Sequence, residues 1–208
     1  MYRLSPIAHK LLSGGEQEGK VNDYVRVPDN NVMQNKQHDL RDLSHQLRVG
    51  FRGAGFVRCL KEEKGMEIPG INQAAQTETN ILTLRLSESE FMFLQLDESE
   101  ESALRSLVDK VQDLGSNSVN SEVYKLPRQD SHACFQLSGL HCNDILAKLC
   151  AVDLRNESFA NGQIAQTSMA HVGVIIVRKD IDELPAYLIL VDSSLAEYLW
   201  DCLIGAMD

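Results

Sequence analysis

Two segments decide the fold of this chain: Ser44–Pro69, SHQLRVGFRGAGFVRCLKEEKGMEIP, and Ser131–Arg155, SHACFQLSGLHCNDILAKLCAVDLR. Each begins with the apolar alternation of a strand, passes a glycine turn, and continues with apolar residues at helical spacing. Gly139 stands where Gly53 stood, and the helix residues that follow keep the same offset of about 86 positions. The two segments therefore predict an internal duplication.

Each of these segments continues in the same way. In the first repeat, residues 81–96 (ILTLRLSESEFMFLQL) alternate like a hairpin, and residues 98–114 form an amphipathic helical stripe. In the second repeat, residues 172–191 form the hairpin and residues 193–207 the helix, while residues 118–127 (SVNSEVYKLP) supply a further strand. The predicted fold class is α+β, with two β-β-α-β-β-α units in register.

The predicted domain organisation follows from this repeat. Residues 1–44 are polar and turn-rich, so we expect an N-terminal arm with one short strand at residues 21–27, VNDYVRV. Residues 45–208 form one duplicated domain, with repeat units at about 45–115 and 119–208. A chain of this length is sufficient to bury the core of such a domain.

The amino-acid composition and net charge of the chain argue against several classes of protein. Thirty acidic against twenty basic residues give a net charge of −10, which argues against a nucleic-acid groove. No charged and apolar leader opens the chain, and no apolar run approaches ~20 residues, so we expect a cytoplasmic protein without a membrane segment. The five cysteines contain no C-x-x-C pair, which favours reduced thiols over a structural zinc site.

Histidines and cysteines are the first candidates for catalysis. His132 and Cys134 would share one face of a strand, and His141-Cys142 stands at a helix start, where the pKa of a thiol can fall. No G-x-S-x-G or H-E-x-x-H motif supports either pair. Packing roles are therefore favoured, and His132, His141 and His171 are interpreted as residues at the ends of elements.

Two further patterns superficially suit ligand chemistry. The glycine-rich segment Gly50–Gly55 follows a strand and opens a helix, which leaves a weak anion site beside Arg52 open. The segment lacks the G-x-G-x-x-G spacing, so a tight turn is the favoured interpretation. The carboxylate pairs Asp97-Glu98 and Glu100-Glu101 fall at the start of a predicted helix, where the helix dipole favours acids, and are not interpreted as a general acid/base pair.

Four residues are candidates for a partner interface. On the last helix, Tyr198 and Trp200 lie together, and a partly exposed tryptophan beside a tyrosine is typical of interfaces, although core packing of Trp200 is the favoured alternative. Gln166 and Thr167 precede the buried run 172–177, and we expect them to orient either a partner or the turn itself.

Three motifs carry a resemblance to a known family: LCAVDLR (149–155), FANGQIAQTSMA (159–170) and SSLAEYLWDCLIGA (193–206). With SPIAHKL (5–11) and DLSHQLRVGFRGAG (42–55), the resemblance spans nearly the whole chain. The sequence resembles the gamma subunit of heterotetrameric sarcosine oxidase and related enzymes that oxidise N-methylated amino acids.

The resemblance implies a fold like the folate-binding, N-terminal domain of the glycine-cleavage T-protein. It further implies alpha, beta and delta partner subunits, which carry FAD, FMN, NAD, zinc and tetrahydrofolate. The folate loop of the T-protein is missing here, because Thr167 leads directly into the apolar run that begins at Val172. We therefore expect a non-catalytic subunit with no cofactor of its own. The alternative is a folate- or pterin-binding module that acts alone.

Overall fold

The fold is described from a computed structural model, which covers residues 5–11, 19–21, 24–26, 38–62, 68–96, 101–116 and 122–207. Its backbone contacts divide the chain into two compact units. The discontinuous unit comprises Met1–His45 and Asp130–Asp208, and the inserted unit comprises Gln46–Gln129. No helix within the described ranges is long and apolar enough to cross a membrane.

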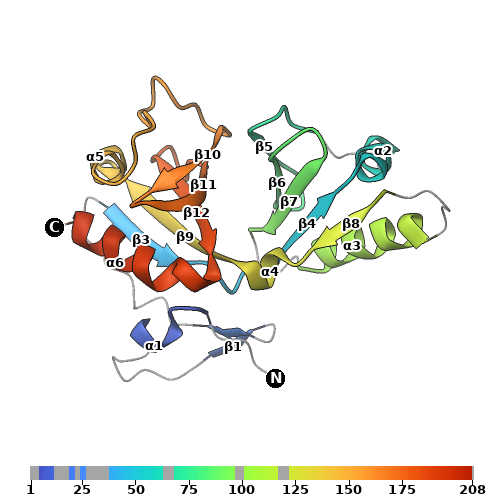
Figure 1. The fold of residues 1–208 in the computed structure, drawn as a ribbon, viewed down its shortest axis with the longest axis horizontal. Helices are drawn as coiled ribbons and strands as arrows, with labels where there is room; N and C mark the ends of the chain where they lie inside the picture. The colour runs from blue at the N-terminus through green and yellow to red at the C-terminus, as the bar shows by residue number, and fades with distance from the viewer. Residues whose placement is uncertain are drawn as a thin grey trace. The chain divides into compact units, whose positions relative to one another are not determined.

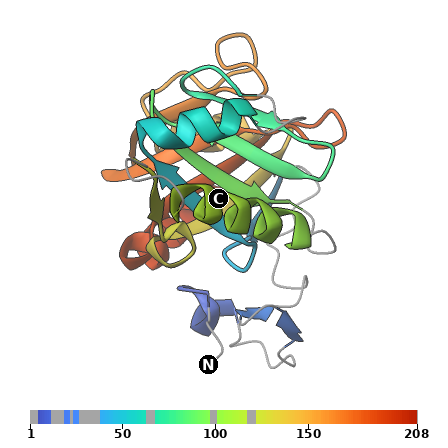
Figure 2. The same ribbon diagram turned by 90° about the vertical axis from the view of Figure 1, so that its right-hand side faces the viewer.

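The inserted unit is a five-stranded antiparallel sheet in the order β5-β6-β7-β4-β8, with two helices on one face (Figure 2). Its elements are β4 (Arg48–Arg52), α2 (Ala54–Glu62), β5 (Gln73–Gln76), β6 (Ile81–Arg85), β7 (Glu90–Gln95), α3 (Glu101–Ser116) and β8 (Tyr124–Leu126). Phe56 of α2 stacks on Phe51 of β4, with ring centroids 4.8 Å apart, and meets Phe93 of β7 edge-on. These buried rings fix the helix to the sheet.

The discontinuous unit is a second five-stranded sheet, in the order β10-β11-β12-β9-β3, covered on one face by two helices (Figure 1). Its main elements are β3 (His38–Asp42), β9 (His132–Gly139), α5 (Cys142–Ala147), β10 (Ile164–Met169), β11 (Val172–Arg178), β12 (Ala186–Asp192), η3 (Ser193–Leu195) and α6 (Ala196–Met207). The short elements are α1 (Ala8–Leu11), β1 (Gly19–Val21), β2 (Tyr24–Arg26) and α4 (Arg128–Ser131).

Four strands of the inserted unit, β5-β6-β7-β4, follow the same order as β10-β11-β12-β9 of the discontinuous unit, so the structure is duplicated. One strand of each sheet comes from an unexpected part of the chain. β8 precedes β9 in sequence but pairs with β4, whereas β3 precedes β4 but pairs with β9. The sequence placed β3 within the arm and β8 within the second repeat. It could not assign the neighbour of either strand, because apolar alternation reports burial and not pairing.

Two local features also differ from the sequence expectation. The predicted single strand at residues 21–27 is replaced by β1 and β2, which pair antiparallel with Val21 opposite Tyr24. Thr167 was expected to lead directly into the apolar run that begins at Val172, but the chain turns between them at Ala170 and His171, whose φ angles are 47° and 67°. This two-residue turn makes β10 and β11 an antiparallel pair.

The glycine turns predicted from the repeat are present in both units. Gly53 and Gly139 have φ angles of 127° and 125°, a region that L residues rarely adopt. A Cβ at Gly53 would lie 1.8 Å from the carbonyl oxygen of Glu122. The glycine therefore permits both the turn and the close approach of the segment that leads into β8.

Trp200 lies in the core of the discontinuous unit, so the hypothesis that it belongs to a partner surface is wrong. Trp200 is only 3% exposed and meets the ring of Phe135 edge-on, at 5.1 Å between centroids. Tyr198, two residues earlier, is 47% exposed, and its hydroxyl donates to the Ala170 carbonyl (3.0 Å). Two positions differ by about 200° around a helix, so one ring faces the sheet and the other faces solvent.

Replacing Trp200 by alanine should therefore destabilise the isolated chain by about 3–5 kcal/mol, as expected for a large ring removed from a packed core. Tyr198→Ala, the matched control on the same helix, should change the free energy of unfolding by less than about 1 kcal/mol. Urea denaturation followed by circular dichroism measures both. Equal destabilisation by the two variants would contradict the assignment of Trp200 to the core.

Candidate functional site

An open hollow of about 390 Å³ lies on the sheet of the discontinuous unit. It brings together Gln166 and Thr167 of β10 with His132 of β9. The remaining lining residues are Gly173, Val174, Ile175 and Leu190. The lining contains no Asp, Glu, Lys or Arg, so the hollow offers hydrogen-bonding groups over an apolar floor and no fixed ionic charge.

The pair Gln166-Thr167 has a counterpart in the other unit. The pentapeptide QAAQT (73–77) in β5 and the following turn matches QIAQT (163–167) in β10. In the registers, Gln76 lies opposite Leu82 and Gln166 lies opposite Ile175. Because both units keep this sequence, the pentapeptide belongs to the common frame, and a partner-binding role for Gln166 and Thr167 remains a prediction.

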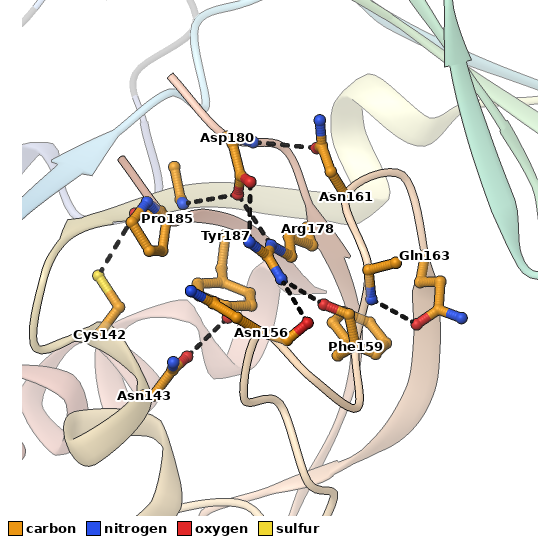
Figure 3. A network of polar contacts seen from close by, with 12 residues as sticks. Cys142, Asn143, Asn156, Phe159, Asn161, Gln163, Arg178, Asp180, Pro185 and Tyr187 are labelled. Atoms are coloured by element: carbon orange, nitrogen blue, oxygen red, sulfur yellow. Dashed lines mark hydrogen bonds and ion pairs between the residues drawn. The ribbon is translucent and has the colours of Figure 1, made fainter. Parts of the chain in front are cut away.

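The best-formed polar network surrounds Arg178 at the end of β11 (Figure 3). Its Nε and Nη2 donate to the two carboxylate oxygens of Asp180 (2.9 and 2.8 Å), and its Nη1 donates to the Phe159 carbonyl (2.6 Å). The Arg178 side chain is 8% exposed. The ion pair with Asp180 raises the pKa of Arg178, so the guanidinium is always charged here. Arg178 thereby holds the segment between α5 and β10.

Tyr187 holds the same segment from β12. Its hydroxyl donates to the Leu154 carbonyl (2.6 Å) and lies 2.7 Å from the side-chain oxygen of Asn143. The ring of Phe159 stacks on the ring of Tyr187, with centroids 6.5 Å apart. Figure 3 shows these groups converging from α5, the segment after it, and the sheet. All of these hydrogen bonds join groups of the chain itself, so the network holds the segment between α5 and β10 in place.

Arg178, Asp180 and Tyr187 were not identified from the sequence, although a signal existed. Arg85, at the end of β6, lies opposite Phe91 as Arg178 lies opposite Tyr187. Arg85 donates to the Pro69 carbonyl (3.2 Å) in the segment that follows α2. An arginine at the end of the same strand in each repeat, opposite an aromatic residue, could have indicated a shared structural role.

The cysteine at the start of α5 corrects one expectation. Cys142 is fully buried, and burial raises the pKa of its thiol to about 12. The suggestion that the helix start could lower this pKa is wrong, because loss of hydration penalises the thiolate more than the helix stabilises it. His141 beside it is exposed and lies 3.2 Å from Asp144.

The other two histidines singled out from the sequence, His132 and His171, lie on the sheet of the discontinuous unit and in one of its turns. His132 Nδ1 lies 2.8 Å from the hydroxyl of its neighbour Ser131. Asp192, opposite His132 in the register, accepts from the backbone and hydroxyl of Ser194 and caps the following helix. His171 is exposed in the β10–β11 turn. Within the described ranges, no three histidine, cysteine or carboxylate side chains are placed to hold a metal ion.

The glycine-rich segment uses its polar groups within the chain. The amide of Gly55 donates to the Glu122 carbonyl (3.2 Å), and Arg52 Nε donates to the carboxylate of Glu90 (2.9 Å), which also pairs with Arg128. The carboxylate of Glu90 thus already accepts from two nitrogens of the Arg52 guanidinium. The acidic residues Asp97, Glu98 and Glu100 lie outside the described residues, and Glu101 begins α3.

The chain resembles known proteins in sequence and in fold. The family model of the GCVT N-terminal domain matches residues 68–208. The chain belongs to this family. A search of curated proteins found no match.

Two solved structures show the same fold as this family member. A chain of the heterotetrameric sarcosine oxidase from Corynebacterium sp. U-96, in complex with pyrrole 2-carboxylate, matches with a TM-score of 0.73 and 22% identity, covering 99% of this chain and 94% of that chain. The glycine cleavage system aminomethyltransferase T from Bartonella henselae matches with a TM-score of 0.71 and 15% identity, covering 99% of this chain but 58% of that chain. The predicted α+β, T-protein-like fold is thereby confirmed.

Burial of Cys142 and Tyr187 predicts a loss of stability at alkaline pH. Burial raises the pKa of both groups to about 12, from usual values of 9.0 for the thiol and 10.0 for the phenol. Above about pH 9 the unfolded chain therefore releases protons that the folded chain retains, so the free energy of unfolding falls as the pH rises towards 12. The urea midpoint should be lower at pH 10.5 than at pH 8. The double variant Cys142→Ala/Tyr187→Phe should show a smaller decrease, and an unchanged decrease would contradict this cause.

Proposed function

We propose that this chain is the non-catalytic gamma subunit of a heterotetrameric, flavin-dependent oxidoreductase that demethylates sarcosine or a related N-methyl amino acid. The observation that carries the proposal is coverage. The likeness to a chain of the sarcosine oxidase extends over 94% of that chain, whereas the likeness to the T protein leaves over a third of that longer chain unmatched. In this proposal, the chain takes the place of that chain of the sarcosine oxidase, which it covers almost fully, and not of a part of the longer T protein.

The described side chains support a role in assembly. Two arginines bind carboxylates of the chain itself: Arg178 pairs with Asp180, and Arg52 pairs with Glu90. The thiol of Cys142 is buried and protonated at neutral pH. A flavin-dependent oxidation of an amino acid also requires a clamp for the substrate carboxylate, and the hollow has no arginine or lysine in its lining.

In this proposal the cofactors and the chemistry belong to the partner subunits. The alpha and beta subunits carry FAD, FMN, NAD and tetrahydrofolate, and the delta subunit carries zinc, in the cytoplasm. This chain contributes neither a cofactor ligand nor a catalytic residue. Its contribution is a stable, acidic body, with a net charge of −10, against which those subunits assemble.

The alternative, a folate- or pterin-binding module that acts alone, is favoured by the family itself and by one feature of the hollow. Gly173 in its floor has an ordinary backbone conformation, and a Cβ added there would meet no heavy atom within 4 Å. A strand glycine that the fold does not need can mark the close approach of a ligand. The hollow, however, provides no cation for the glutamate tail of a folate.

Purification through a tag on this chain, in cells that express its neighbouring subunits, tests the proposal. We expect a complex with flavin absorbance and amine-dependent activity. Replacement of His132, His141 or His171 by glutamine should leave kcat within about threefold, which is under ~1 kcal/mol of barrier. A hundredfold lower kcat in an intact complex would contradict the non-catalytic role.

A second outcome would favour the alternative. It is a chain that purifies alone, without flavin, and binds tetrahydrofolate saturably at micromolar concentration in calorimetry. Gly173→Val, which adds a side chain to the floor of the hollow at a position where a Cβ would meet no heavy atom within 4 Å, should then weaken that binding while leaving the fold intact.

A further inference from the structure

Three large apolar side chains are exposed at one end of the discontinuous sheet. Leu140 is 69% exposed, Leu184 44% and Ile181 40%. They lie on two turns that meet, because the amide of Gly139 donates to the Pro185 carbonyl (3.0 Å). We call Leu140 together with the turn Ile181–Leu184 the acidic prong, since Asp182 and Glu183 form its exposed tip.

The duplication shows that the fold does not require this prong. In the inserted unit, Ala54 takes the place of Leu140, and β6 and β7 are joined by the four residues Leu86–Ser89. In the discontinuous unit, β11 and β12 are joined by the seven residues Lys179–Pro185. Because the same hairpin closes without the insertion, the three added residues and their apolar side chains are not needed to build the sheet.

The backbone conformation of the prong also indicates a functional role. Ile181 and Leu184 exchange two backbone hydrogen bonds (3.0 and 2.8 Å), so Asp182 and Glu183 are the central residues of a two-residue turn. Their φ angles are 48° and 68°, a conformation for which asparagine and glycine are strongly preferred. Two carboxylates are thus held at the tip in a strained conformation, and such strain is concentrated at functional segments.

We propose that the acidic prong is a docking surface for a partner subunit that presents an apolar pocket rimmed by lysine or arginine. The inference rests on the proposed function, since it assigns the subunits of that complex as the occupant. Ile181, Leu184 and Leu140 would enter the pocket, and the carboxylates of Asp182 and Glu183 would meet the basic rim. A lipid surface fits poorly, because insertion of the apolar side chains would carry both carboxylates out of water.

Two double variants separate the apolar and the charged contributions. I181S/L184S removes the apolar side chains. D182N/E183G removes both charges and introduces the preferred Asn-Gly turn, so it should raise the melting temperature of the chain while weakening docking. The matched control is I71S, which removes an isoleucine of the inserted unit that is 48% exposed.

The measurement is the affinity of each full-length variant for the remaining subunits, purified together without this chain, at 50 and 500 mM NaCl. Each prong variant should bind at least tenfold more weakly than the wild type at 50 mM NaCl, and I71S should bind normally. The affinity of D182N/E183G should also depend less on salt than that of the wild type.

Three results would overturn the inference. Prong variants that bind like the wild type would exclude this surface and leave the proposed function untouched. A wild-type chain that associates with no flavoprotein would remove the proposed function and this inference together. Prong-dependent binding to phosphatidylcholine vesicles, with normal subunit assembly, would show a lipid surface in place of a protein partner.

Discussion

In each unit, one connecting segment runs from an inner strand through a helix to the edge strand of the sheet. The fold depends on how this segment is held in place. In the discontinuous unit the chain leaves β9, passes through α5, and re-enters the sheet at its edge as β10, with β12 and β11 lying between the two strands. Such a crossing segment has no ladder partner for its carbonyls. Arg178 supplies the missing donors at Asn156 and Phe159, and Tyr187 supplies one at Leu154. The ion pair with Asp180 orients the guanidinium for this role.

The duplication separates what the fold needs from what this chain adds. The glycine turn, the QxAQT strand and the arginine opposite an aromatic residue occur in both units, so they belong to the frame. The acidic prong occurs in the discontinuous unit, and the inserted unit closes the corresponding hairpin with three fewer residues. Under the proposed function, in which the chemistry lies in other subunits, the two repeats are expected to differ on the surfaces where partners bind.

Much of the frame was predictable because its signals are local. Gly53 and Gly139, the two hairpins and the two long helices follow from turn chemistry and apolar periodicity. The exchange of outer strands could not be derived, because it depends on neighbours that alternation does not specify, whereas core packing of Trp200 was already the favoured interpretation of the last helix. The β10–β11 turn was missed because alanine and histidine, which form it at positions 170 and 171, are not typical turn residues. The contacts of Arg178 with the Asn156 and Phe159 carbonyls could not be read from those residues, because any residue offers a backbone carbonyl; only the matching arginine of the other repeat, Arg85, gave a signal.

The central claim is that Arg178 holds the crossover, and its replacement by methionine tests this most directly. Trp200, the only tryptophan, reports unfolding of this unit by fluorescence. Arg178→Met removes the guanidinium from the half-buried carboxylate of Asp180 and leaves the carbonyls of Asn156 and Phe159 without this donor, so we expect a loss of about 3 kcal/mol and a urea midpoint lower by about 1–2 M. Arg155→Met breaks an exposed pair with Asp153 and should leave the midpoint unchanged. An unchanged midpoint in Arg178→Met would contradict the account.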